Sequence, residues 1–138
     1  MYREIRNVTF IGAGNMGCFN AAKAACAGYK VTLYDINEAS LDRARVLCQG
    51  YADYFLSTDY CSAETARQAT SDIIFTTDFA LASSDADLVS ESVFEQLDLK
   101  REVHRNLDTL CQTHTILTTN ASFLLGSHIE DAVARGDR

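Results

Sequence analysis

The sequence GAGNMG at residues 12–17 has the glycine spacing of turns that bind the pyrophosphate of a dinucleotide. Gly12 permits a tight turn, Gly14 lets the backbone approach the pyrophosphate, and Gly17 lets a helix pack closely on a strand. The free N–H groups at the start of that helix would bind the diphosphate. The pattern alone is common, but here it ends a strand-like run and opens a helix-like run, which is the context that the mechanism requires.

An acidic residue stands where a dinucleotide site needs one. Asp35 ends a second strand-like run, 18 residues after Gly17, and its carboxylate can accept hydrogen bonds from the ribose 2′- and 3′-hydroxyls of adenosine. It would repel a 2′-phosphate by about 4 kcal/mol per unit charge at about 4 Å and an effective dielectric of about 20. No basic residue follows before Arg43. The sequence therefore predicts NAD rather than NADP, although a helix-capping role for Asp35 stays open.

Strand-like and helix-like runs alternate along the whole chain, which predicts an α/β domain built on a parallel sheet with right-handed crossovers. Apolar runs with β-branched residues predict strands at 7–11, 30–34, 72–75, 86–90 and 114–118. Helical spacing predicts helices at 15–27, 37–55, 62–69, 96–110 and 127–134. Because no proline, repeat or linker divides the chain, we expect one domain over residues 1–138.

Composition narrows the classes of function. The chain has 138 residues and a net charge of −7, which argues against binding to nucleic acid. No apolar run approaches the roughly 20 residues that span a bilayer, and no signal-peptide pattern is visible, so no membrane association is expected. Five cysteines without a C-x-x-C pair and three scattered histidines indicate reduced thiols, no metal site and a cytoplasmic location.

The second half of the chain carries more specific motifs. They are T-T-D at 76–78, E-x-L-x-x-K at 95–100 and T-N-A-S at 119–122. Together with the glycines and the long helical stretch after the second strand, these motifs resemble the 3-hydroxyacyl-CoA dehydrogenase family over essentially the whole chain. Pyrroline-carboxylate reductases and 3-hydroxyisobutyrate dehydrogenases look similar at the glycines but lack the arrangement of Glu95, Lys100 and Ser122.

The resemblance implies a Rossmann-type doubly wound parallel sheet with a helical excursion after the second strand. It also implies positions for Glu95 and Lys100 near the nicotinamide ribose, for Asn120 beside the nicotinamide, and for Ser122 on the reacting oxygen of the substrate. The predicted NAD-binding set is Gly12, Gly14, Asn15, Met16, Gly17, Asp35, Glu95, Lys100 and Asn120. Structural roles stay open for four residues. Glu95 could complement a helix dipole, Lys100 could be a solvated charge, and Asn120 and Ser122 could be turn residues.

The activity that the resemblance implies is NAD-dependent oxidation of an L-3-hydroxy group to a ketone, on an acyl-CoA or a related hydroxy acid. No lysine lies between Lys30 and Lys100, which is a poor match for the phosphates of coenzyme A. The L-gulonate dehydrogenase and lambda-crystallin branch is therefore an alternative. A non-catalytic NAD(H)-binding sensor or structural module is another.

The family's general base, a His in an H-x-x-N-P strand, and its partner Glu are not found in this sequence. We therefore expect the chain to be the cofactor-binding part of a longer parent, with a further domain that carries the remaining catalytic residues and a homodimer interface. By itself the chain is expected to bind NAD(H) without turnover. His128, in the last predicted helix, is expected at the surface.

Replacing Asp35 with Ala is expected to weaken NADH binding by roughly tenfold or more, because hydrogen bonds to a charged group are lost. A fluorescence titration with NADH measures the affinity. Asp53→Ala, which removes the same charge outside the predicted site, serves as the control. Equal affinities for both variants would contradict the role given to Asp35.

Overall fold

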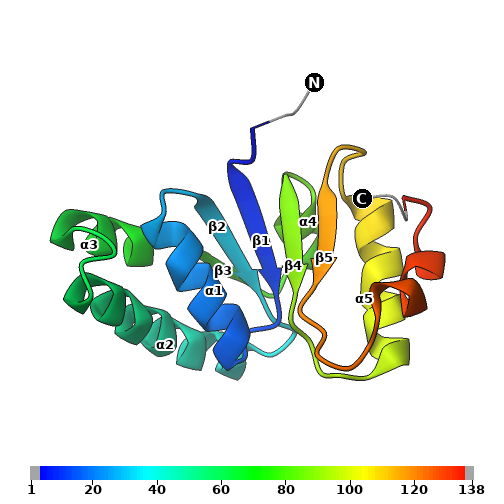
Figure 1. Ribbon diagram of the computed structural model, residues 1–138, viewed down its shortest axis with the longest axis horizontal. Coiled ribbons are helices and arrows are strands. Elements are labelled where there is room, and N and C mark those ends of the chain that lie inside the picture. The colour runs from blue at the N-terminus through cyan, green and yellow to red at the C-terminus, as the bar shows by residue number, and fades with distance from the viewer. Residues whose placement is uncertain (1–3, 136–138) are drawn as a thin grey trace.

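The computed structural model describes residues 4–135, and its centre is a parallel sheet (Figure 1). The described strands lie in the order β3-β2-β1-β4-β5. They are β1 (Asn7–Ile11), β2 (Lys30–Tyr34), β3 (Ile74–Thr76), β4 (Leu88–Glu91) and β5 (Ile116–Thr119). The chain reverses its direction across the sheet after β3, so the switch point lies between the carboxyl ends of β1 and β4, where open α/β sheets bind ligands.

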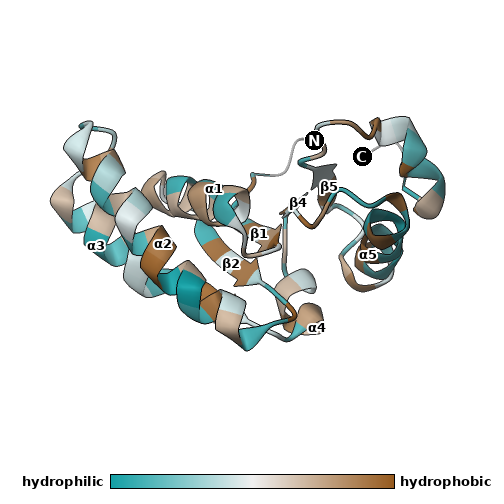
Figure 2. Ribbon diagram, turned by 90° about the horizontal axis from the view of Figure 1, so that it is seen from below, coloured by the Kyte–Doolittle hydropathy of each residue, from teal (hydrophilic) through white to brown (hydrophobic). Residues whose placement is uncertain are grey.

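Helices cover both faces of the sheet. α1 (Asn15–Cys26), α2 (Glu38–Ser57) and α3 (Ala63–Asp72) pack on one face, and α4 (Phe79–Ser83) and α5 (Leu97–Leu110) pack on the other. Seen from below, α1 and α4 lie on opposite sides of the strands (Figure 2). The predicted doubly wound, Rossmann-type fold is confirmed, and α2 and α3 are the predicted helical excursion.

The strands are apolar on both sides because each face meets a core. Val8 and Phe10 of β1 join the core under α1 and α2, whereas Ile11 joins Val89 in the core under α5. This division follows the alternation of side chains along a strand. The one polar residue between them, Thr9, is buried and donates from Oγ1 to the carbonyl of Ala82 at 2.6 Å.

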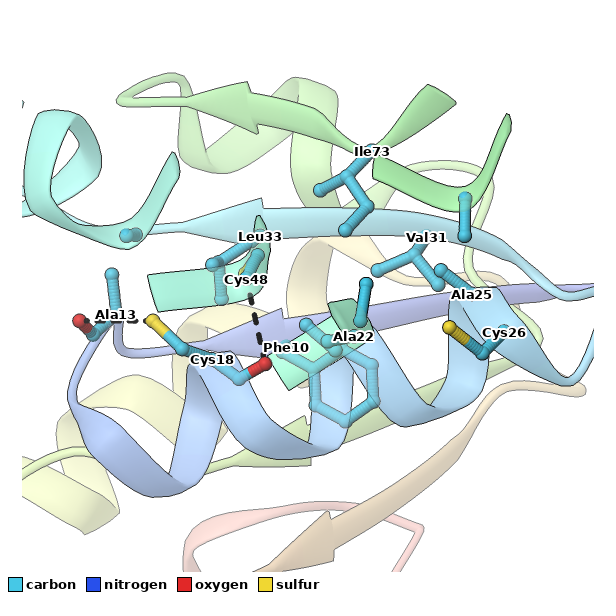
Figure 3. Packing of buried hydrophobic residues seen from close by; sticks show 14 of the residues in the cluster. Phe10, Ala13, Cys18, Ala22, Ala25, Cys26, Val31, Leu33, Cys48 and Ile73 are labelled. Carbon is cyan, nitrogen blue, oxygen red and sulfur yellow. Dashed lines mark hydrogen bonds between the residues drawn. The ribbon is translucent and has the colours of Figure 1, made fainter. Parts of the chain in front are cut away.

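Small side chains allow α1 to lie close to the sheet. In Figure 3, Ala22 and Ala25 of α1 lie beside the strand residues Phe10 and Val31, and the Sγ of Cys18 points to the carbonyl of Ala13. The contact is closest at Gly17, where a Cβ would stand 1.9 Å from the carbonyl oxygen of Gly12. No other residue fits between this helix and its turn.

The last predicted helix, at 127–134, is wrong. The structure has two short 3₁₀ turns there, Gly126–His128 and Glu130–Ala132. Two groups that an α-helix would need are bonded to α5 instead: Arg101 donates to the carbonyl of His128 at 2.8 Å, and the N–H of Ala134 donates to Asp108 at 2.9 Å. Tertiary hydrogen bonds thus replace the helical ones. His128 is exposed, as predicted.

Other differences concern short elements. The sequence interpretation missed α4, whose N-cap Asp78 accepts a hydrogen bond from the N–H of Leu81 at 3.0 Å. It also began the third, fourth and fifth strands two residues early, since these strands begin at Ile74, Leu88 and Ile116. Residues 136–138, the end of the run expected to lead into a further strand, lie outside the described residues.

The cysteines are free thiols, and four of the five are buried. Burial raises the pKa of Cys26 to about 12 and that of Cys111 to about 11. These two thiols therefore stay protonated at neutral pH and act as small apolar side chains. The prediction that most cysteines pack in the core is confirmed.

Within residues 4–135, no helix combines the length and the apolar character that crossing a membrane requires. The same residues contain no cluster of three or more His, Cys, Asp or Glu side chains with the arrangement of a metal site.

Gly17→Ala is expected to lower the free energy of unfolding by about 3 kcal/mol, because the new methyl group overlaps a backbone oxygen that cannot move away. Urea unfolding measures the change. Gly50→Ala is the matched control: this glycine lies in α2 with open space around it, so alanine should gain up to about 1 kcal/mol through helix propensity. Equal unfolding midpoints for the two variants would contradict the close contact.

Candidate functional site

The turn between β1 and α1 is held against two neighbouring strands. The N–H of Gly12 donates to the carbonyl of Tyr34 at 2.8 Å, and the N–H of Ser92 donates to the carbonyl of Ile11 at 2.8 Å. Gly12 has a φ of +105°, and a Cβ there would lie 2.8 Å from the oxygen of Ser92. The switch point of the sheet therefore requires glycine at this position.

Gly14, the N-cap of α1, opens onto free space. No side chain caps the helix, and a Cβ at Gly14 would meet no atom within 4 Å. Asn15 and Met16 are exposed beside it. The first N–H groups of a helix lack partners within the helix and carry partial positive charge. This end of α1 therefore suits the diphosphate of a dinucleotide.

Asp35 lies against the same turn. Its Oδ2 accepts a hydrogen bond from the N–H of Ala13 at 2.9 Å, and its Oδ1 accepts one from the N–H of Asn37 at 2.9 Å. A carboxylate has about four acceptor positions, so about two remain for ribose hydroxyls. The capping role is taken by Asn37, whose side chain accepts from the N–H of Ala39. Asp35 is thus fixed beside the glycines and keeps capacity for a ligand.

A second group of charged side chains lies at the carboxyl end of β4. Glu91 is fully buried, and its Oε1 accepts from the Nζ of Lys100 at 2.8 Å and from the N–H of Val93 at 2.6 Å. Its Oε2 accepts from the Oγ1 of Thr119 at 2.7 Å. The Nε2 of His104 lies 3.5 Å from Oε2, without the alignment of a hydrogen bond.

Burial by itself would raise the pKa of Glu91. The contacts with His104, Lys100 and Thr119 outweigh burial, and the pKa lies below its usual value. The hydrogen bonds from Lys100 and Thr119 are short and stabilise the ionised form of Glu91 directly. Glu91 is therefore a carboxylate at neutral pH, and its charge is matched by the Lys100 ammonium.

Glu95 connects this group to the segment that follows β5. Its Oε1 accepts three backbone hydrogen bonds, from Ser122 at 3.2 Å, Phe123 at 3.0 Å and Leu124 at 3.1 Å. The N–H of Phe123 is the largest cause that lowers the pKa of Glu95, and the N–H groups of Leu124 and Ser122 and the charge of Lys100 act in the same direction. One carboxylate thus shapes the loop that contains Ser122.

The comparison with protein families agrees with this arrangement. Residues 7–138 match the model described as 3-hydroxyacyl-CoA dehydrogenase, NAD binding domain. The chain belongs to this family. NAD is accordingly its cofactor, as the glycines and Asp35 predicted.

Similar proteins include dehydrogenases of more than one substrate. A probable 3-hydroxyacyl-CoA dehydrogenase of Caenorhabditis elegans is 35% identical over 97% of this chain and 45% of its own length. A 5-formyl-3-hydroxy-2-methylpyridine 4-carboxylate 5-dehydrogenase of Mesorhizobium japonicum is 36% identical over 86% of this chain and 37% of its own. The chain therefore spans less than half the length of these relatives.

Among solved structures, a diketoreductase superimposes with a TM-score of 0.93 at 39% identity, covering 99% of this chain and 48% of that one. That diketoreductase acts on dicarbonyl compounds.

The structure places the predicted NAD-binding residues of this family member along one edge of the sheet. Asn120 follows β5 directly, and its N–H donates to the carbonyl of Glu91 at 2.7 Å; Asn120, Ser122 and Glu95 are exposed. Lys100 differs, because it has no exposed side-chain surface and its Nζ lies 3.6 Å from Glu95 Oε2. It is not the solvated helix charge considered above, and it reaches the site through Glu95.

The sequence interpretation did not identify Glu91, Thr119 and His104. Lys100, His104 and Leu107 are the buried residues of α5, and their spacing of four and three residues puts them on one helix face. That spacing is a signal that Lys100 and His104 are buried with Leu107. Without knowledge of a buried acid that contacts them, however, two such polar side chains are normally assigned to solvent.

The residues present fit NAD at both ends. At the adenosine end, α1 and Asp35 have free donors and acceptors, as described above. At the switch point, the Oγ of Ser92 is buried with no hydrogen-bond partner among the described residues. A buried hydroxyl without a partner costs free energy, and a polar group of a ligand in this position would supply one.

Glu95→Ala is expected to speed the hydrogen exchange of the Ser122, Phe123 and Leu124 amides by roughly tenfold, because their shared acceptor is removed. Exchange followed by ¹⁵N NMR measures the effect. Glu102→Ala, which removes an exposed acid from the helix α5 that follows Glu95, is the control. Unchanged exchange in Glu95→Ala would show that the loop is held by other contacts.

Proposed function

We propose that the whole protein to which this chain belongs oxidises an L-3-hydroxy group to a ketone with NAD. The observation that carries the proposal is the loop after β5. It contains Asn120 and Ser122, Glu95 fastens it, and it lies at the same strand edge as the glycine turn. Membership of the family supports the reaction class.

Different residues of the chain bind different parts of NAD and the substrate. NAD, when bound, supplies the hydride acceptor. The N-terminus of α1 binds its diphosphate, Asp35 holds the adenosine ribose, and Asn120 lines the nicotinamide pocket. The hydroxyl of Ser122 donates a hydrogen bond to the reacting oxygen of the substrate, which orients it and stabilises charge that develops there.

Removal of the hydroxyl proton is assigned to a residue outside this chain. The resemblance places the base in an H-x-x-N-P strand, and the 138 residues contain no proline. The relatives extend to more than twice the length that they share with this chain. The proposal therefore gives proton removal, and a homodimer interface, to that remaining part of the protein.

The charges of α2 and α3 favour a free hydroxy or keto acid over a coenzyme A thioester. By the resemblance, members that use acyl-CoA contact the coenzyme with lysine and serine side chains of this excursion. Between residues 38 and 72, six acidic residues stand against three arginines and no lysine. Arg45 is already engaged, 3.9 Å from Asp42 and 4.6 Å over the ring of Phe75. The phosphates of coenzyme A would meet net negative charge here.

Compartment and pathway follow as further proposals. Free thiols at all five cysteines fit a reducing compartment, and we place the protein in the cytoplasm. We propose a role in fatty acid metabolism only if the substrate is a coenzyme A thioester.

The test follows NADH oxidation by the whole protein with acetoacetyl-CoA and with free 3-keto acids at equal concentration. We expect kcat/KM to favour free acids by roughly tenfold or more. A preference for the thioester would contradict the argument from charge and place the protein in fatty acid metabolism.

The same experiment also tests the alternative function, a non-catalytic module. A protein that binds NADH but turns over neither substrate class would be a non-catalytic NAD(H)-binding module, and the proposed activity would be wrong. Ser122→Ala supplies the matched variant: it should lower kcat by roughly tenfold or more while NADH affinity stays within about twofold.

A further inference from the structure

Glu91 contacts both segments that line the nicotinamide end of the site. Its side chain accepts from the Nζ of Lys100 and from the Oγ1 of Thr119, and its carbonyl accepts from the N–H of Asn120. The first contact leads to the start of α5, and the other two lead to the end of β5. A single residue therefore joins the two segments from beneath.

The route through α5 reaches the Ser122 loop in two steps. The Nζ of Lys100 bonds to Glu91 Oε1 at 2.8 Å and to the carbonyl of Val93 at 3.3 Å, which leaves it 3.6 Å from Glu95 Oε2. The other oxygen of Glu95 accepts the three backbone bonds from the loop. The position of Glu95 thus depends on an ammonium group that Glu91 fixes.

The route through β5 is direct. Thr119 Oγ1 lies 2.7 Å from Glu91 Oε2, and the N–H of Asn120 lies 2.7 Å from the carbonyl oxygen of Glu91. Thr119 and Asn120 are therefore both hydrogen-bonded to Glu91, which fixes the position of the backbone where the chain leaves β5.

Burial of its side chain excludes direct contact between Glu91 and a cofactor. The side chains of Glu91 and Lys100 are both 0% exposed, so Glu91 has no surface with which to touch NAD. A buried ion pair adds little net stability compared with apolar residues of the same size. Here the short hydrogen bonds from Lys100 and Thr119 tie two segments to one carboxylate.

We propose that Glu91 is a positioning residue that sets the nicotinamide half of the NAD site, acting through Lys100 and Glu95 on one side and through Thr119 on the other. The inference rests on the proposed placement of the nicotinamide beside Asn120 and Ser122. The adenosine half, formed by the glycines and Asp35, makes no hydrogen bond to the Glu91 side chain, so we expect it to be unaffected when that side chain is changed.

The test compares NADH with ADP, which occupies only the adenosine half. Glu91→Gln combined with Lys100→Met removes the ion pair without leaving one buried charge unpaired. In the 138-residue chain, calorimetric titration of this double variant should show NADH affinity reduced about tenfold and ADP affinity within about twofold of the original. Hydrogen exchange of the Ser122, Phe123 and Leu124 amides should become faster as well.

Asp87→Asn is the matched control. Asp87 is a buried carboxylate at the other end of β4, where it accepts from the N–H groups of Arg6 and Asn7. This variant should change NADH and ADP affinity equally or not at all. Thr119→Val tests the second route with a substitution of the same shape, and NADH affinity should fall about threefold.

Equal losses of NADH and ADP affinity in the double variant would overturn the inference, since a general loss of structure affects both halves. Unchanged NADH affinity in both Thr119→Val and the double variant would overturn it too. An original chain that binds NADH no more tightly than ADP would instead contradict the placement of the nicotinamide, and with it the proposed function.

Discussion

The backbone contact between Gly17 and the carbonyl of Gly12 fixes where α1 begins, and much of the site follows from that position. A helix that starts so close to β1 presents its first N–H groups at the gap between β1 and β4. The small residues Ala21 and Ala22 continue the close approach along the helix. The chain turns back across the sheet at the same gap, which is where open α/β sheets bind ligands, and a Cβ at Gly14 would meet no atom within 4 Å.

The two halves of the site are built in different ways. The adenosine half uses backbone groups and one carboxylate from a continuous stretch, residues 12–37, and its geometry is set by local turns. The nicotinamide half uses side chains from β4, α5 and the segment after β5, which lie up to 33 residues apart in the sequence, from Glu91 to Leu124. Its shape depends on long-range hydrogen bonds and on charges held out of water.

This difference explains what could be predicted from the sequence. The five strands and most of the helices follow from alternation, and the structure contains them; local spacing also puts Asp35 beside the glycine turn, where its Oδ2 accepts from the N–H of Ala13. The burial of Lys100 and His104 was not predicted, although they share a helix face with Leu107, because such side chains are normally assigned to solvent and only the fold brings Glu91 to them. The helix expected at 127–134 failed for a similar reason: Arg101 and Asp108 of α5 take the groups that helical hydrogen bonds would use.

The pairing of Glu91 with Lys100 also limits how this sequence can drift. Loss of either partner alone leaves one charge buried without compensation, which costs about 3–5 kcal/mol. A domain of ordinary stability has only about 5–15 kcal/mol in total. A change at one position therefore removes a large share of the stability unless the other changes too, so we expect the two positions to be replaced together.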